Sequence, residues 1–166
     1  MPEHKTIEKA RKAKREGKSP TTQAGEFVRE TIHHIRKGKH GARSTKQAIA
    51  IGLSKARRAG VDLPPPKKGQ TSERTRKSAE RAFERGHGAG GKSRPSKRRS
   101  RAIRRALSRE GTSAASHAAL SKQAKAAARR RPAKERSAAA RKAAQTKGPV
   151  KRRAAARKAA RTRARG

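Results

Sequence analysis

Apolar residues in the first 60 positions recur at the spacing of amphipathic helices. A charged stretch over residues 6–16 ends at Gly17 and predicts a first helix. After Ser19, Thr21 or Thr22 is placed to cap a second helix that runs to Lys37. Its apolar residues keep the 3/4 spacing of one buried face: Ala24, Phe27, Val28, Ile32 and Ile35. Gly38 then follows at the position of a C-terminal glycine cap.

A third helix is predicted from Ser44 or Thr45, as cap, to Gly60. Within it, large and small apolar residues alternate, which also fits a short strand: Ile49, Ile51 and Leu53 with Ala48, Ala50 and Gly52. We favour the helix because cap signals bracket the segment and good helix formers flank it. The expected buried stripe is Ile49, Leu53 and Ala56, which leaves Ile51 as a candidate contact for a protein partner.

Downstream of position 63 the apolar pattern weakens. Three consecutive prolines predict a stiff spacer over residues 64–70. Short helices are expected over residues 73–85 and from Ser96 or Ser100 to Gly111, with a glycine-rich hinge between them. An alanine-rich helix is expected from Thr112 or Ser113 to Pro132. The chain therefore divides into a small helical unit (1–63), the spacer (64–70), basic short helices (71–110) and a tail rich in Ala, Lys and Arg (111–166).

The tail contains a repeat. Residues 138–146 read AAARKAAQT and residues 154–162 read AAARKAART, with Gly148-Pro149 between the copies. Alanine favours helix, but like charges four residues apart oppose it. We expect the tail to be largely disordered when free and to become helical when phosphates neutralise it. The predicted fold class is mostly α: a small N-terminal helical unit, short helices and a largely disordered basic tail.

Composition supports this division. Fifty residues are Lys or Arg and eleven are Asp or Glu, which gives a net charge of +39. Of the sixteen apolar side chains larger than Ala, eleven lie in the first 63 residues, so the core is expected there. No apolar run approaches the roughly 20 residues of a membrane span. We also expect no secretory signal, and the absence of Cys excludes disulfides and thiol catalysis.

A charge of this size indicates a polyanionic ligand. Nucleic acid is the ligand we expect most, and an anionic membrane surface is the next candidate. A lone basic run is usually a solvated face, but repeated runs without acids repel one another unless a polyanion binds. The predicted nucleic-acid-binding residues of the third helix are Arg43, Lys46, Lys55, Arg57 and Arg58. Those downstream are Lys97, Arg98, Arg99, Arg101, Arg104, Arg105, Arg129, Arg130, Arg131, Arg141, Lys142, Lys151, Arg152, Arg153, Arg157 and Lys158.

Two other motifs resemble a nucleotide-binding loop and a metal site, but neither has the sequence context that such a site requires. Residues 86–93, GHGAGGKS, match the phosphate-loop pattern GxxxxGK[ST], but a charged helical segment precedes them where that loop requires a buried strand. His33, His34 and His40 lie close in sequence, but Gly38 separates the last from the others, and solvated or phosphate-facing histidines are expected. We predict no enzyme activity, no cofactor and no metal site.

Duplex DNA is the favoured ligand. Proteins that bind single strands stack bases on aromatic side chains, and this chain has only Phe27 and Phe83, both expected in a core. Because phosphate contacts do not read sequence, we expect sequence-independent binding and compaction at the bacterial nucleoid, in the cytoplasm. Two alternatives stay open: an RNA-binding or ribosome-associated accessory factor, and an adaptor that the tail localises on nucleic acid.

Three stretches carry a family resemblance: residues 21–28 (TTQAGEFV), 38–60 (GKHGARSTKQAIAIGLSKARRAG) and 113–121 (SAASHAALS). The chain resembles an uncharacterised bacterial family of small basic proteins with the core GARSTKQAIAIGLSKARRAG, and the last stretch resembles the family's downstream part. This resemblance implies no activity or site. The tail is also similar in composition to linker-histone tails and bacterial histone-like proteins, which agrees with DNA binding.

Overall fold

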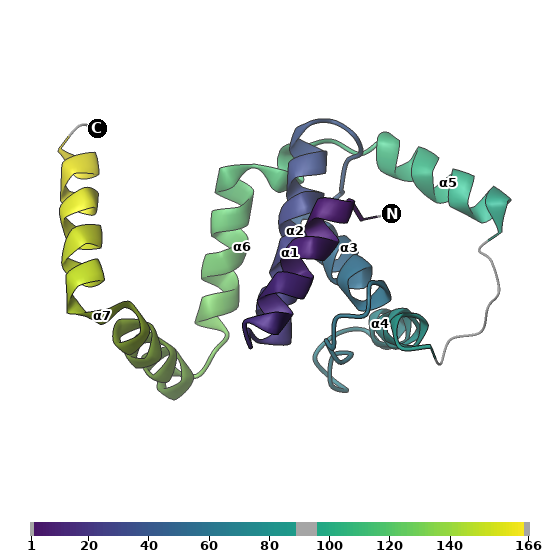
Figure 1. Ribbon diagram of the computed structural model, residues 1–166. Helices are drawn as coiled ribbons and strands as arrows, with labels where there is room; N and C mark the ends of the chain where they lie inside the picture. The colour runs from purple at the N-terminus through teal and green to yellow at the C-terminus, as the bar shows by residue number, and fades with distance from the viewer. Residues whose placement is uncertain (1, 89–95, 165–166) are drawn as a thin grey trace. The chain divides into compact units, whose positions relative to one another are not determined.

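Helices and their connections make up the part of the chain that the computed structural model describes, residues 2–88 and 96–164, and no strand occurs in it (Figure 1). The helices are α1 (His4–Arg15), α2 (Pro20–Arg36), α3 (Thr45–Arg58), α4 (Glu73–Gly86), α5 (Lys97–Ser108), the 3-10 helix η1 (Ser113–Ala115), α6 (His117–Arg129) and α7 (Ala133–Arg163). The prediction of a mostly α chain is confirmed. Contacts divide the chain into two compact units, Met1–Gln123 and Ala124–Gly166.

The end of α2 and the start of α3 follow local capping signals. The predicted cap of α2 at Thr21 or Thr22 is wrong, because α2 begins at Pro20 and Ser19 at its N-cap position makes no side-chain capping hydrogen bond. The Ser44 hydroxyl accepts a hydrogen bond from the backbone N–H of Gln47 at 3.2 Å and caps α3 as predicted. Gly38, with φ of +69°, closes α2, and its N–H donates to the Ile35 carbonyl at 3.0 Å. The segment with the ambiguous alternation is therefore helical, and the strand alternative does not apply.

The core of the first unit forms around α2. Four of the five residues predicted for its buried face are buried, and Val28 is half-buried: Ala24, Phe27, Ile32 and Ile35 are 0–8% exposed. One cluster joins Phe27 to Ala10 of α1, Ala56 of α3 and Val61. The other joins Ile32 and Ile35 to residues of α3 and η1. Helix α2 thus packs on both sides and holds the unit together.

Helix α3 buries a different face from the predicted one. Ala48, Gly52 and Ala56 are buried, whereas Ile49, Ile51 and Leu53 are half-buried. The reason is the close approach of α3 to α2, because a Cβ added at Gly52 would lie 2.6 Å from the Cα of Val28. Only small side chains fit between helices at that separation. Of the predicted stripe, Ala56 is buried and Leu53 is half-buried and packs against the core cluster around Phe27, whereas Ala48 and Gly52 take the place expected of Ile49.

The first residues of the predicted tail belong to the core of the first unit. Ala114 and Ala115 of η1 are buried in the cluster around Ile35. Arg36 donates from Nε to the Ala115 carbonyl at 2.8 Å, and the Thr45 hydroxyl donates to the Ala114 carbonyl at 2.8 Å. Residues 111–123 are thus held by side chains that lie about seventy positions earlier in the chain, and they are structurally distinct from the rest of the tail.

The prediction of a largely disordered tail is wrong, because helices α6 and α7 cover most of it. Helix α7 is two helical halves joined at Gly148, whose φ of +66° and ψ of 168° are not helical. A like-charge pair costs only about 0.2–0.5 kcal/mol, whereas alanine exceeds ordinary residues in helix propensity by up to roughly 0.7 kcal/mol per position. Alanine therefore outweighs the repulsion, and the expected coil-to-helix transition on binding DNA is withdrawn.

Candidate nucleic-acid interface

Helix α5 presents six cations to solvent. Ser96 caps it, and all six side chains are exposed: Lys97, Arg98, Arg99, Arg101, Arg104 and Arg105. Helix α5 has no buried residue along its length. Backbone hydrogen bonds tie its C-terminal end to the loop after α2, from Gly41 N–H to the Leu107 carbonyl at 2.8 Å and from Ala42 N–H to the Gly111 carbonyl at 3.2 Å. The helix is thereby attached at one end with its cationic side free.

Gly41 is required for this attachment. A Cβ at position 41 would collide with the backbone carbonyl of Glu110, which follows α5. The close approach of these two backbones therefore depends on glycine at this position. The glycine lies in the GARSTKQ stretch, so this stretch both starts α3 and holds the end of α5.

The predicted binding residues of the second unit lie at its surface. All those from position 129 onward are exposed. Within the described ranges, no salt bridge involves any of them, because the acidic side chains that form ion pairs all lie at or before Glu80. Residues 124–166 contain one acid, Glu135, beside seventeen basic residues, and a surface with so large an excess of exposed cations attracts a polyanion strongly.

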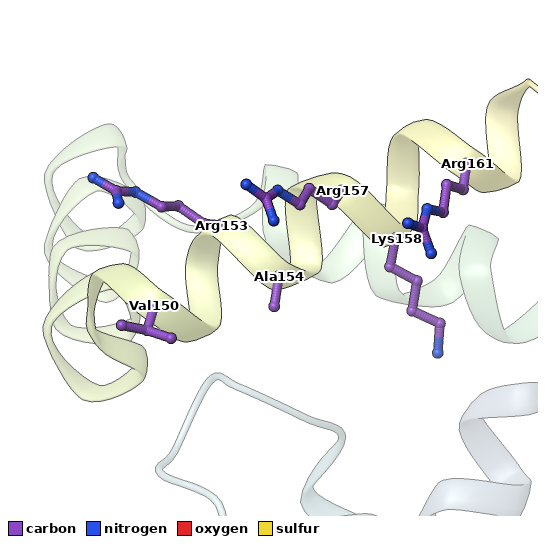
Figure 2. A pocket seen from close by; sticks show the side chains of 6 residues that line it. All are labelled: Val150, Arg153, Ala154, Arg157, Lys158 and Arg161. Atoms are coloured by element: carbon purple, nitrogen blue, oxygen red, sulfur yellow. The ribbon is translucent and has the colours of Figure 1, made fainter.

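Four cations gather on one side of the C-terminal half of α7 (Figure 2). They line an open hollow of about 720 Å³ together with Val150 and Ala154: Arg153, Arg157, Lys158 and Arg161. We call these four residues the cationic face of α7. Arg153, Arg157 and Arg161 are spaced four residues apart and so lie in successive turns of the helix, and Lys158 is adjacent to Arg157.

Two predicted binding residues are engaged inside the protein. Arg57 is 6% exposed, and it donates to the backbone carbonyls of Leu63 at 3.0 Å and Pro64 at 3.1 Å. Its burial lowers its pKa. It therefore holds the segment that leads into the triple proline. Lys55 forms an ion pair with Glu30, with 3.1 Å between its Nζ and the carboxylate Oε1.

The other three predicted residues of this region remain accessible. Arg43 and Lys46 are exposed at the start of α3. Arg58 is exposed and donates to the Ser54 hydroxyl at 2.7 Å. Of the predicted residues, therefore, all but Lys55 and Arg57 present their charge at the surface.

Glu30 is the centre of a polar network between α1, α2 and α3. Its side chain is 3% exposed and accepts from the Glu3 backbone N–H at 3.1 Å and from Lys55. Burial acts to raise the pKa of Glu30. Hydrogen bonds from Thr6, the Glu3 backbone and Lys55 outweigh burial and hold this pKa below its usual value. The network fixes the start of the chain against α2.

The histidines take part in this network. His34 lies between two carboxylates, with its Nε2 2.7 Å from Oε1 of Glu3 and its Nδ1 3.9 Å from Oε1 of Glu30. The hydrogen bond with His34 lowers the pKa of Glu3. The expectation of a solvated or phosphate-facing side chain is therefore wrong for His34. Across the part of the chain that the structure describes, no three His, Asp or Glu residues are grouped as metal ligands.

The phosphate-loop match follows helix α4. The buried strand that such a loop requires is therefore replaced by a helix. Residues 89–93 of the motif lie outside the described residues.

Sequence reasoning missed Arg161 as a member of the cationic face. The signal was present in the repeat, because Arg161 occupies the position that Gln145 holds sixteen residues earlier. A comparison of the two copies, position by position, identifies Arg161 as a basic residue that the first copy lacks. Arg153 is gained in the same way, at the position of Ser137.

Residues 4–68 match a family of unknown function (DUF6496). This match includes the GARSTKQ stretch and confirms, for this part of the chain, the resemblance to an uncharacterised family. It contains α1, α2 and α3 and ends before α4, so the cations of α5, α6 and α7 lie outside it. No curated protein and no solved structure matches the chain. Among the helices of the described residues, none has the length and apolarity needed to cross a membrane.

Proposed function

We propose that the protein binds duplex DNA without sequence preference and compacts it, as a nucleoid-associated protein of the bacterial cytoplasm. The exposed cations of α5, α6 and α7 would contact phosphates, and the unit built on α2 would hold α5. The observation that carries the proposal is the exposure of these cations without acidic partners in the described ranges. Double-stranded DNA, with a negative charge every ~1.7 Å of its axis, is the simplest complement to such a surface.

The aromatic side chains favour a duplex over a single strand. Phe27 is fully buried in the core, and Phe83 is half-buried and stacks on His87 with 3.9 Å between ring centroids. The sequence contains no Tyr and no Trp. A protein without exposed Phe, Tyr or Trp rings lacks the side chains on which successive bases of a single strand stack best.

A salt titration tests the proposal. The chain is mixed with random-sequence duplexes, and the logarithm of affinity is measured against that of salt concentration. With roughly ten phosphates neutralised, a slope near about −9 is expected. A slope shallower than about −3 would contradict the electrostatic account.

A second measurement distinguishes DNA from RNA in the cell. A lysate is treated with DNase or with RNase, and sedimentation of the protein is compared. Release by DNase alone is expected. Release by RNase alone would replace the proposal with an RNA-associated role, which was the alternative in the sequence analysis.

A further inference from the structure

Helix α5 has an apolar side that is open to solvent. Because successive residues turn by about 100° around a helix axis, four apolar residues share one sector of roughly 140°: Ala102, Ile103, Ala106 and Leu107. We call these four residues the apolar side of α5. Ile103 is 55% exposed, whereas every other isoleucine of the chain is buried or half-buried. Contacts between the cations of α5 and phosphates do not account for this exposed isoleucine.

The cations of α5 lie mostly opposite its apolar side. Five of the six fall in a sector of roughly 120°: Lys97, Arg98, Arg101, Arg104 and Arg105. Arg99 falls within the apolar sector, in the first turn, and its long side chain can carry the guanidinium away from an apolar surface. The helix contains no acidic residue. This separation of basic and apolar residues is typical of helices that lie flat in a membrane interface.

An anionic lipid bilayer complements both sides of α5. Its negative surface potential attracts the arginines and the lysine. The boundary between its headgroups and acyl chains accepts an apolar side chain such as that of Ile103. DNA phosphates, by contrast, complement only the cations. The exposed isoleucine therefore favours a lipid surface as the partner of this helix.

The apolar side is too short for a helix that fills a groove in a protein. Such a helix uses apolar anchors at positions i, i+3 or i+4, and i+7. Ile103 and Leu107 supply two anchors of this series. The positions that would supply a third are polar, namely Arg99, Ser100 and Glu110. A lipid surface needs no third anchor and is the better match.

We infer that α5 lies flat in the headgroup region of an anionic lipid bilayer, with Ile103 turned toward the acyl chains and Arg98 and Arg104, at the edges of the apolar side, on headgroup phosphates. With 12 residues, α5 is too short to cross a bilayer. The inference goes beyond the proposed function, because it assigns the chain a second polyanion. Contacts with DNA phosphates need only charge, whereas insertion needs an apolar side chain at position 103, so the two are tested separately.

Tryptophan fluorescence tests the position of residue 103, because the chain contains no Trp and no Tyr. Ile103→Trp in the full chain is compared with Ser108→Trp, a change at an exposed, uncharged residue among the cations. The probe is vesicles of phosphatidylcholine and phosphatidylglycerol in equal parts. On these vesicles the emission of Ile103→Trp should shift to shorter wavelengths and be quenched by brominated acyl chains. Ser108→Trp should keep the emission that it has in buffer, and vesicles of phosphatidylcholine alone should change neither variant.

Vesicle affinity tests the contribution of the isoleucine itself. Ile103→Ser is expected to lose roughly tenfold or more in affinity for the anionic vesicles, because an apolar side chain no longer leaves water. The matched control is Val150→Ser in α7, at a valine that is 77% exposed, and it should change vesicle affinity little. Sedimentation with vesicles, at a salt concentration that weakens purely electrostatic attraction, measures both. Affinity for a random DNA duplex should be that of the wild type in both variants.

Emission of Ile103→Trp that stays at its wavelength in buffer on anionic vesicles would overturn the inference and leave an acidic protein groove as the partner of the apolar side. Equal losses of vesicle affinity in Ile103→Ser and Val150→Ser would also overturn it. A loss of DNA affinity in Ile103→Ser as large as its loss on vesicles would assign the apolar side to DNA instead. A wild-type chain that binds no duplex DNA would overturn the proposed function, whereas the shifted emission of Ile103→Trp would still support insertion.

Discussion

Gly52 of α3 lies directly against the backbone of Val28 of α2, so that a Cβ at position 52 would come within 2.6 Å of the Val28 Cα. This contact explains why α3 buries its small residues and leaves its isoleucines half-buried. At the start of the same helix, the Thr45 hydroxyl donates to the Ala114 carbonyl of η1. Arg36 of α2 bonds to the same segment, so one helix crossing organises the whole core.

Replacing Gly52 with Ala is expected to destabilise the protein by about 1–3 kcal/mol, because the backbones must move apart to admit a methyl group. Urea unfolding monitored by circular dichroism measures this. The matched control is Gly25→Ala in α2, where an added Cβ meets nothing within 4 Å. That change should stabilise by about 0.5–1 kcal/mol, since alanine is the better helix former. Destabilisation of the same size in both variants would contradict the close packing at Gly52.

Arg57→Ala is expected to reduce stability by about 1–3 kcal/mol while changing DNA affinity little. The substitution removes a side chain that is itself buried and takes the donor away from the half-buried carbonyl of Leu63 and the carbonyl of Pro64. Thermal unfolding and anisotropy titration on the same preparations measure the two effects. Arg43→Ala, at an exposed position, is the control and should leave stability within about 0.5 kcal/mol. A large loss of DNA affinity in a fully folded Arg57→Ala variant would show that Arg57 does contact DNA.

Two truncations distinguish the core segment from the rest of the tail. A chain ending at Gln123 loses seventeen basic residues and one acidic residue, and a chain ending at Glu110 loses eighteen and one. The charge lost is almost the same, so both should bind DNA weakly. Only the shorter chain loses the buried Ala114 and Ala115, together with their hydrogen bonds to Arg36 and Thr45. Its melting temperature should therefore be several degrees lower, and equal melting temperatures would contradict the docking of η1.

Stability should fall in acid through Glu30. The pKa of Glu30 is lowered on folding, so the unfolded chain binds more protons than the folded chain between the two pKa values. The carboxylate thus contributes stability that is present above its unfolded pKa of about 4.3 and is lost as pH falls through the lower, folded value.

Glu30→Gln should lower stability at neutral pH by about 1–3 kcal/mol and flatten its dependence on pH below about 4.5, since the charged partner Lys55 loses its carboxylate. Urea unfolding at a series of pH values measures both effects. Glu26→Gln, on the same helix and outside this network, serves as the control. If the stability of Glu30→Gln fell with decreasing pH as steeply as that of the wild type, groups other than Glu30 would be responsible for the loss of stability in acid.

The sequence by itself determined the helices of the first 60 residues and most of their ends, but not the start of α2, which lies at Pro20 and not after Thr21 or Thr22. These features depend on contacts within a few residues, such as the Ser44 cap and the turn at Gly38, so the necessary information is local. The charge of the tail and its repeat are equally visible in the sequence. The disorder predicted for the tail was wrong because the balance between alanine propensity and like-charge repulsion is quantitative, and the composition alone suggests the opposite result.

Only the tertiary structure decided which cations are available to a ligand. Lys55 and Arg57 have the same charge as Arg58, but Lys55 pairs with Glu30 of the preceding helix, and Arg57 donates to the carbonyls of Leu63 and Pro64, where the chain folds back past the end of α3. The buried face of α3 was also decided by the tertiary structure, because it depends on the separation of two helix axes. The position of η1 was decided in the same way, because its partners are far away in sequence. Periodicity shows that a helix has an apolar side, but a partner element determines how close that side can come.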